Sequence, residues 1–297
     1  VTTTAVYRIA LSFMQNKHGL PQLTLGKESG FAVIGYGKVG GWELGYSSDL
    51  DLVFLNDSQK HSAMTDGEKP IANDVFYARL GQRMIHQFTT RMSSGQLYEI
   101  DMRLRPNGKA GLLVTSLKAF EKYLREEAWT WEHQALVRAR AIAGDAVTMA
   151  GFQEIRKNIL RLKRDVPVLQ QEVREMREKM RESLDSSDEH QFDIKQGVGG
   201  IADIEFMVQY AVLRWACDFP ELTEWSGNAR ILEVLARQAL LPNDLAEQLL
   251  KAYRAFRGEY HRRVLQQEKG LVSREFFDSE RKRVTGAWQM LMLDSAS

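Results

Sequence analysis

Three glycines and two aspartates lie close together in the sequence, and their spacing is compatible with two kinds of nucleotide site. Gly35, Gly37 and Gly40 form the pattern G-x-G-x-x-G after an apolar run, which is typical of a dinucleotide-binding turn. Asp49 and Asp51 then follow, two residues apart, among residues that favour strands. A dinucleotide site uses one acidic residue about 20 positions further on to hold a ribose, so a pair of strand carboxylates does not fit it.

The two aspartates, together with Asp101, have the composition of a metal site. Residues two apart in a strand point to the same face of a sheet, so Asp49 and Asp51 share a face. Asp101 lies on the polar face of a second predicted strand, 96–104, and would join them if the two strands are neighbours. Carboxylates this close need a counter-ion, and Mg²⁺ takes carboxylate oxygens, water and substrate phosphates as ligands. The pattern predicts a site for two Mg²⁺ ions that supports phosphoryl transfer. The alternative, which is stronger for Asp101 than for the other two, is that these aspartates cap turns or pair with nearby arginines.

The glycines fit the same site. Eleven residues separate Gly37 from Asp49, and a glycine turn after a strand lets backbone N–H groups approach nucleotide phosphates. Lys38 can add a positive charge, and Ser47 or Ser48 a hydroxyl group. A glycine turn, a serine and D-x-D on the next strand indicate a nucleoside triphosphate site more strongly than G-x-G-x-x-G indicates a dinucleotide site.

These motifs resemble those of known nucleotidyltransferases. The pattern Gly37-x₁₁-Asp49-x-Asp51, with Asp101 on a later strand, resembles the DNA polymerase β-like superfamily. Within it, the sequence resembles the glutamine synthetase adenylyltransferase family over about residues 30–215. Four segments carry this resemblance: GYGKVGGWELGYSSDLDLVFL, YEIDMRLRPNGKAGLL, WEHQALVRARAIAGD and KQGVGGIADIEFMVQY. The family has two homologous halves, of which the first removes AMP from a tyrosine of glutamine synthetase and the second attaches it. The form GYGKVGGWELGY is similar to the second half.

The resemblance implies roles for the acidic residues and a set of partners. Asp49, Asp51 and Asp101 would bind the metals, and Asp101 would also orient the attacking tyrosine hydroxyl. ATP would be the substrate, glutamine synthetase the protein that is modified, and PII signal protein and glutamine the effectors of the full-length enzyme. Neither nucleic acid nor a membrane is expected as a partner.

Two arginines share the face of Asp101. Arg103 and Arg105 are candidates for phosphate contact, because a guanidinium offers a planar fork of donors. The alternative is that they pair with Glu99 or with Asp101 itself.

A second glycine-rich segment, 197–200, precedes an apolar helix. We predict that this loop and Lys195 line the nucleotide cleft, opposite the strand that carries the two aspartates. Asp203 and Glu205 lie near the start of the helix, where acidic residues complement the helix dipole, and this is the alternative role of the segment.

Two other functions remain open on the sequence. The chain could be the deadenylylating half, which uses phosphate to release ADP from the modified tyrosine, because the same carboxylates serve both directions. It could also be a regulatory module that binds nucleotide or PII without catalysis. The three aspartates argue against this second alternative, because a module that only binds has no need of them.

The elements that position these residues predict an α+β fold. Residues 1–145 would form the polymerase β-like catalytic core with a mixed sheet, and residues 146–297 an all-helical bundle. We expect helices and strands in the core at 3–17, 31–36, 38–44, 49–55, 74–92, 96–104 and 111–115, and almost no strand after 117. Further helices are expected at 165–184, 203–217, 228–240, 243–266 and 273–293.

Composition excludes several classes of protein. The 40 basic and 39 acidic residues leave a net charge of +1, which gives no sign of a nucleic-acid or membrane partner. One cysteine, Cys217, excludes an internal disulfide and favours a cytoplasmic location. No run is long enough to span a membrane and no secretory pattern is present. The sequence starts with Val1, inside an apolar-periodic segment, so we expect a fragment of a longer protein.

Overall fold

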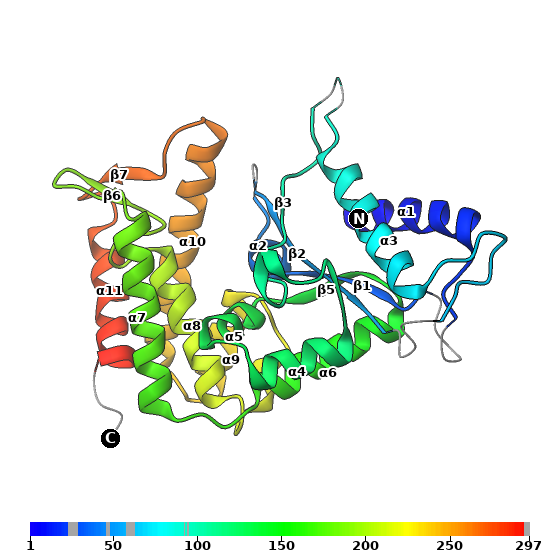
Figure 1. The fold of residues 1–297 in the computed structure, drawn as a ribbon. Coiled ribbons are helices and arrows are strands. Elements are labelled where there is room, and N and C mark those ends of the chain that lie inside the picture. The colour runs from blue at the N-terminus through cyan, green and yellow to red at the C-terminus, as the bar shows by residue number, and fades with distance from the viewer. Residues whose placement is uncertain (23–28, 46–47, 58–62, 92, 94, 294–297) are drawn as a thin grey trace. The chain divides into compact units, whose positions relative to one another are not determined.

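The chain forms two compact units in a computed structural model that describes residues 1–22, 29–45, 48–57, 63–91, 93 and 95–293. The first unit comprises residues 1–159 and the second residues 160–297 (Figure 1). The first unit therefore extends beyond residue 145, where we expect the catalytic domain to end, and takes in helix α6 (Ala146–Leu160) almost completely.

A mixed five-stranded sheet forms the centre of the first unit. Four strands follow the order β3-β2-β1-β5, and β4 also pairs with β2. Strand β1 is antiparallel to β2 and β5, whereas β2 is parallel to β3 and β4. The strand bounds are β1 Phe31–Gly35, β2 Leu50–Asn56, β3 Ile100–Asp101, β4 Val114–Ser116 and β5 Arg140–Gly144.

Helices α1 (Thr2–His18) and α3 (Asn73–Thr89) cover one face of this sheet (Figure 1). Alternate residues of β1 and β2, among them Val33, Leu52 and Phe54, pack against the two helices and are fully or almost fully buried. The residues between them, including Val53 and Leu55, are buried on the other face. Asp51 belongs to this second set, so the alternation of β2 places its carboxylate on the face opposite α1 and α3.

The first unit also contains shorter helices. Their bounds are α2 Gly37–Gly40, α4 Leu117–Glu126 and α5 Thr130–Val137, with a 3₁₀ turn at Gly108–Ala110. The predicted helix 38–44 is therefore only the one-turn helix α2.

Two predictions about strands were wrong. The predicted strand 96–104 pairs with β2 only at Ile100 and Asp101, because the backbone N–H of Arg103 donates to the Asp101 carboxylate and starts a turn. Its alternation was nevertheless correct, since Tyr98, Ile100 and Met102 pack against the core. The sequence showed almost no strand signal after residue 117, yet β5 is the second partner of β1. Its buried residues are the small Ala141 and Ala143, which carry little strand preference.

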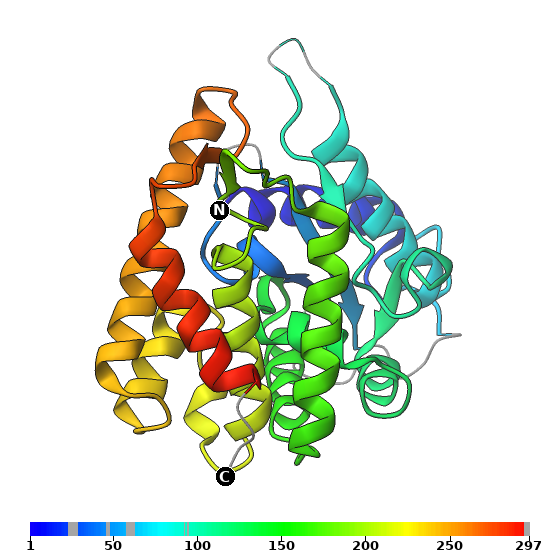
Figure 2. The ribbon, with the colours of Figure 1, turned by 90° about the vertical axis from the view of Figure 1, so that its left-hand side faces the viewer.

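The second unit is built from helices that lie side by side (Figure 2). Their bounds are α7 Val166–Leu184, α8 Ile201–Trp215, α9 Asn228–Arg237, α10 Asn243–Leu265 and α11 Asp278–Trp288, with a 3₁₀ turn at Pro220–Thr223 and a π turn at Gln289–Leu293. Asp165 caps α7, because its Oδ1 accepts from the Val168 amide at 3.1 Å. None of the helices in the described part of the chain has the length and apolarity that a membrane crossing requires.

A small antiparallel sheet interrupts this helical unit. Strands β6 (Gln191–Asp193) and β7 (Leu271–Ser273) pair across a long stretch of chain. The expectation of an all-helical unit missed this sheet, because three-residue strands leave too short a pattern to detect.

Candidate active site

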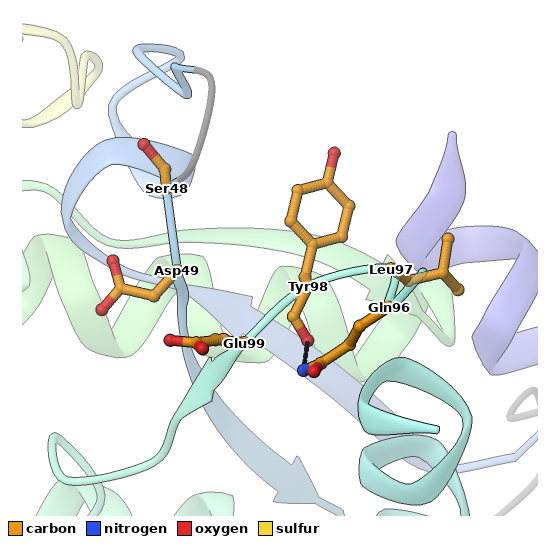
Figure 3. A pocket seen from close by; sticks show the side chains of 6 residues that line it. All are labelled: Ser48, Asp49, Gln96, Leu97, Tyr98 and Glu99. Carbon is orange, nitrogen blue, oxygen red and sulfur yellow. Dashed lines mark hydrogen bonds between the residues drawn. The ribbon is translucent and has the colours of Figure 1, made fainter. Parts of the chain in front are cut away.

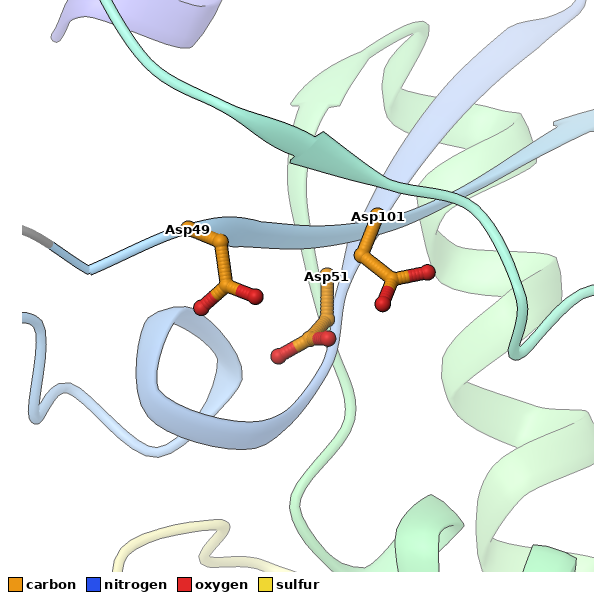
Figure 4. Close-up of side chains that lie close together, drawn as sticks. All are labelled: Asp49, Asp51 and Asp101. Carbon is orange, nitrogen blue, oxygen red and sulfur yellow. The ribbon is translucent and has the colours of Figure 1, made fainter.

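Three carboxylates meet at the edge of the first unit's sheet (Figure 4). Parallel pairing of β2 with β3 places Asp51 directly opposite Asp101, and Asp49 precedes β2 on the same face as Asp51. One oxygen from each carboxylate lies within 4.8 Å of those of the other two. Ligands on opposite sides of Mg²⁺ lie about 4 Å apart, so the donor set fits a small hard cation.

Burial and charge both act on Asp51. Removal from water, and next the neighbouring charges of Asp49 and Asp101, raise the pKa of Asp51 from 3.8 to about 6. Lys38 and Arg103 oppose this shift without cancelling it. The three acids therefore repel one another in the folded protein, and a divalent cation would relieve that repulsion.

Arg103 forms a close pair with Asp101. Its Nε and a terminal guanidinium nitrogen lie 2.7 and 2.5 Å from Oδ2 of Asp101, and its backbone N–H donates to Oδ1 at 2.8 Å. These bonds lower the pKa of Asp101 below its usual value, so this carboxylate stays ionised. Arg103 therefore pairs with Asp101, which was the alternative to phosphate contact. Its guanidinium nevertheless remains largely exposed to solvent.

Arg105 holds its own loop together. Its guanidinium donates to the carbonyl oxygens of Met102, Lys109 and Gly111 at 2.9, 3.1 and 3.3 Å. The side chain does not pair with Glu99 or Asp101 in these bonds. Contact of Arg105 with a phosphate stays a prediction.

Gly37 lies against the carboxylate of Asp51. Its φ of +55° is in the left-handed region, and a Cβ atom on it would lie 2.8 Å from Oδ2 of Asp51. A side chain at this position would therefore press on the carboxylate cluster as well as strain the backbone. Lys38 follows in the same turn and is close enough to lower the pKa of Asp51.

Two arginines near β5 hold the glycine turn in place, and the sequence did not single them out for this role. Arg140 donates to the carbonyl oxygens of Val39 and Gly40 at 3.1 and 3.2 Å. The buried Arg138 forms an ion pair with Glu43. Both arginines belong to the segment WEHQALVRARAIAGD, which carries part of the family resemblance. The sequence did not indicate that they hold the glycine turn.

Ser48 is buried beside Asp49. Its Oγ accepts from the backbone N–H of Gly45 at 3.3 Å, which ties the end of the glycine turn to the start of β2. The other serine that we considered, Ser47, lies outside the described residues.

Two open pockets adjoin the carboxylates, and both include Asp49 and Glu99. The first, which we name the Tyr98 pocket, has a volume of about 370 Å³ (Figure 3). It is lined by Ser48, Asp49, Gln96, Leu97, Tyr98 and Glu99. The second, the Arg103 pocket, has a volume of about 490 Å³. It is lined by Asp49, Glu99, Ile100, Asp101, Met102, Arg103, Arg105 and Lys109.

The pockets include residues that sequence reasoning missed. Lys109 lines the Arg103 pocket and helps to lower the pKa of Asp101. Its place in a Pro-Asn-Gly turn next to the predicted arginines was the available signal. Gln96, Leu97 and Tyr98 gave no signal beyond strand alternation.

The glycine-rich segment of the second unit is tightly held. The carboxylate of Asp203, in the first turn of α8, accepts from Nε of Arg177 at 2.6 Å, from the Gly199 amide at 2.7 Å and from Arg181 at 3.0 Å. Arg177 and Asp203 are both buried, so this is an internal ion pair that also fixes the glycine loop. Asp203 lies in the first turn of α8, as the alternative role requires, and in addition it pairs with Arg177 and binds the glycine loop, which the sequence did not predict.

Lys195 lies at the start of the same loop. Its backbone N–H donates to Oδ1 of Asp193 at 2.9 Å, and it lines a pocket within the second unit together with Gln196 and Tyr260. Its contact with nucleotide stays a prediction.

Comparison with known families agrees with this geometry. The family model described as glutamate-ammonia ligase adenylyltransferase matches residues 2–155, which is more than half of the 297 residues. This match contains the whole five-stranded sheet and the three carboxylates. A second family model, described as GlnD PII-uridylyltransferase, matches residues 168–289, within the second unit. Both descriptions are those of nucleotidyltransferases.

Proposed function

The chain belongs to the glutamate-ammonia ligase adenylyltransferase family, and we propose that it transfers AMP from ATP to a tyrosine hydroxyl of glutamine synthetase. The observation that carries this proposal is the convergence of Asp49, Asp51 and Asp101 beside a left-handed glycine turn. A binding module would gain nothing from three carboxylates that repel one another, whereas a metal-dependent transferase requires them.

The residues divide the work of the reaction. Asp49, Asp51 and Asp101 would hold Mg²⁺, which neutralises charge on the reacting phosphate when bound. Gly37, Lys38 and Ser48 would receive the phosphates of ATP, helped by Arg103 and Arg105.

In the transfer itself, the tyrosine oxygen attacks the α-phosphorus. The bond from that phosphorus to the bridging oxygen of the β-phosphate breaks, and pyrophosphate leaves. Asp101 stays ionised beside Arg103, so it can accept a hydrogen bond from the attacking hydroxyl and orient it. The hydroxyl proton passes to solvent, and no covalent intermediate on the protein is needed.

The same proposal covers effectors and location. We expect PII signal protein and glutamine to regulate the full-length enzyme, and the match of residues 168–289 to a family model whose description names PII supports this expectation. A cytoplasmic location is expected for an enzyme that acts on glutamine synthetase.

One experiment tests both the activity and its direction. The protein is incubated with unmodified glutamine synthetase and ATP labelled at the α-phosphate, with Mg²⁺ or with EDTA, and peptide mass spectrometry locates the label. We expect AMP on a tyrosine only when Mg²⁺ is present. In a parallel reaction, adenylylated glutamine synthetase is incubated with phosphate. ADP release there, without transfer in the first reaction, would identify the deadenylylating half instead.

A further inference from the structure

The three tryptophans of the first unit are all exposed. Trp42, Trp129 and Trp131 have exposed fractions of 77%, 72% and 37%, although tryptophan has one of the largest apolar side chains. Trp42 is covered on one face, since the guanidinium carbon of Arg140 lies 3.7 Å from the centre of its ring. Within the part of the chain that the structure describes, the indoles of Trp129 and Trp131 stack on neither a ring nor a guanidinium.

Trp129 neither caps nor packs the helix that it begins. It is the N-cap residue of α5, a position where serine, threonine, aspartate or asparagine is preferred because its side chain accepts a backbone N–H. An indole has no acceptor for such a bond. The buried side of α5 is formed by other residues, namely His133, Gln134, Leu136 and Val137. The fold therefore gives no reason for exposed tryptophans at 129 and 131, whereas protein interfaces are enriched in this residue.

Hydrogen bonds join this segment to the loop that follows Asp101. Oε2 of Glu132 accepts from the Trp129 backbone N–H at 2.9 Å, and its Oε1 accepts from the Tyr123 hydroxyl at 2.7 Å. The Tyr123 hydroxyl also interacts with the backbone N–H of Asn107. Asn107 lies in the turn that starts after Asp101, so connected bonds run from the tryptophans to the loop of the acid that would orient the attacking hydroxyl.

Glu132 also lies near the glycine turn. Tyr36 directly follows β1 and is the N-cap of α2. Burial, and next the charge of Glu132, raise the pKa of the Tyr36 hydroxyl. Residues 31 and 33 of β1 pack toward α1 and α3, so strand alternation places Tyr36 on the other face, which carries Asp51. The start of α5 is therefore on the same side of the sheet as the carboxylates.

We propose that Trp129 and Trp131 form a docking surface for the protein that supplies the tyrosine. This inference rests on the proposed function, because it assumes a protein acceptor whose hydroxyl reaches Asp101. A stable interface covers about 800 Å² on each partner, far more than one tyrosine side chain occupies. The acceptor protein must therefore also contact surface beside the site, and the two indoles offer apolar surface there.

The charge around the two tryptophans indicates what the partner's surface carries. Residues 126–137 include three glutamates and neither lysine nor arginine. The matching surface of the acceptor protein should present lysine or arginine side chains, which carboxylates attract and which stack on indole faces. One of the glutamates, Glu126, already pairs with Lys122, so this attraction is local and modest.

Substitutions of the tryptophans test the docking surface. Trp129→Ala and Trp131→Ala each remove an indole and leave the buried side of α5 intact. Trp129→Phe keeps an aromatic ring and should retain most of the affinity. Trp225→Ala, in the second unit and with an exposed fraction of 45%, is the matched control. Surface plasmon resonance would give the Kd for glutamine synthetase, and steady-state kinetics would give kcat and the KM for glutamine synthetase and for ATP.

We expect Trp129→Ala to raise the Kd and the KM for glutamine synthetase about tenfold or more, as for an aromatic interface residue. Trp131→Ala should have a smaller effect, because less of its side chain is exposed. The kcat, the KM for ATP and the affinity for MgATP should match those of the wild type. Glutamine synthetase should also slow hydrogen exchange of the amides of residues 127–133, and MgATP alone should not.

The outcomes separate the two proposals. Wild-type protein that transfers no AMP to glutamine synthetase would overturn the proposed function, and this inference with it. Active wild-type protein whose Trp129→Ala and Trp131→Ala variants keep the original Kd for glutamine synthetase would overturn the docking surface alone. The docking surface would also fail if Trp225→Ala weakened binding equally. A rise in the KM for ATP, with protection of residues 127–133 by MgATP alone, would assign the tryptophans to the nucleotide instead.

Discussion

Replacement of Asp51 by asparagine should stabilise the metal-free protein while it abolishes AMP transfer. The folded protein raises the pKa of Asp51 from 3.8 to about 6, mainly through burial and next through the charges of Asp49 and Asp101. An acid whose pKa is raised on folding stabilises the folded state only below its unfolded pKa, and this contribution is lost as the pH rises through the folded pKa. Asparagine has the same shape and no charge, so it removes the penalty at neutral pH.

The expected gain in unfolding free energy follows from the change in the pKa of Asp51. A difference of about two pKa units corresponds to about 3 kcal/mol of unfolding free energy at about pH 8, and to about half of that near pH 5. The shift already includes the opposing attraction of Lys38, so we expect the Asp51→Asn variant to gain up to about 3 kcal/mol at about pH 8. The gain should shrink as the pH falls toward 3.8, the ordinary pKa of an aspartate.

The assay is urea unfolding in EDTA, followed by circular dichroism and by hydrogen exchange of the β1 and β2 amides. The exchange of these amides reports on the unit that contains Asp51. Asp218→Asn, at an exposed position of the second unit, is the matched control and should change neither stability nor activity. Added Mg²⁺ should stabilise the wild type by mass action and leave the variant unaffected.

Either of two results would refute this reasoning. The first is an Asp51→Asn variant that is no more stable than the wild type at about pH 8 without metal. The charge of Asp51 would then not destabilise the folded protein. The second is retained AMP transfer in this variant or in Asp49→Asn, which would remove the substituted residue from the metal site.

Three further predictions test other parts of the structure. Gly37→Ala should weaken ATP binding and slow transfer, because the added methyl group would meet Oδ2 of Asp51 and a side chain at this left-handed position costs about 1 kcal/mol of backbone strain. Wild-type protein should not bind NAD. Titration with ATP and with NAD checks both expectations. Arg177→Met should destabilise the second unit by about 3–5 kcal/mol, because it removes one partner of a buried ion pair; an unfolding free energy equal to that of the wild type would contradict the pair's role. Binding to glutamine synthetase should weaken only modestly from low to physiological salt, since the net charge is +1; a loss by orders of magnitude in a titration series would show that bulk attraction dominates.

Several features of the site were predictable from the sequence because they depend on local geometry. The spacing of Asp49 and Asp51 determines that both carboxylates leave one face, since side chains alternate in any strand. The apolar runs before Gly35 and after Asp51 determined the two central strands, which are buried on both faces. Asp165 determined the start of α7 through a bond that spans three residues.

Other features came from contacts between distant segments. Asp101 joins the cluster because β3 pairs with β2 in parallel register, and the sequence could state this only as a condition. Strand β5 was missed because its buried residues are alanines, and only its pairing with β1 makes it a strand. The roles of the arginines also depended on the fold. Arg103 donates to Asp101, Arg105 to carbonyl oxygens of its own loop and Arg140 to a carbonyl oxygen of the glycine turn.

The sequence therefore determined which chemical groups the site contains, and tertiary structure decided which of them meet. The physical reason is one of range. Strand alternation and helix capping act over two to four residues and leave a periodic pattern in the chain. A guanidinium, by contrast, can reach any acceptor that folding brings within a few ångströms of it, and no pattern in the sequence records that choice.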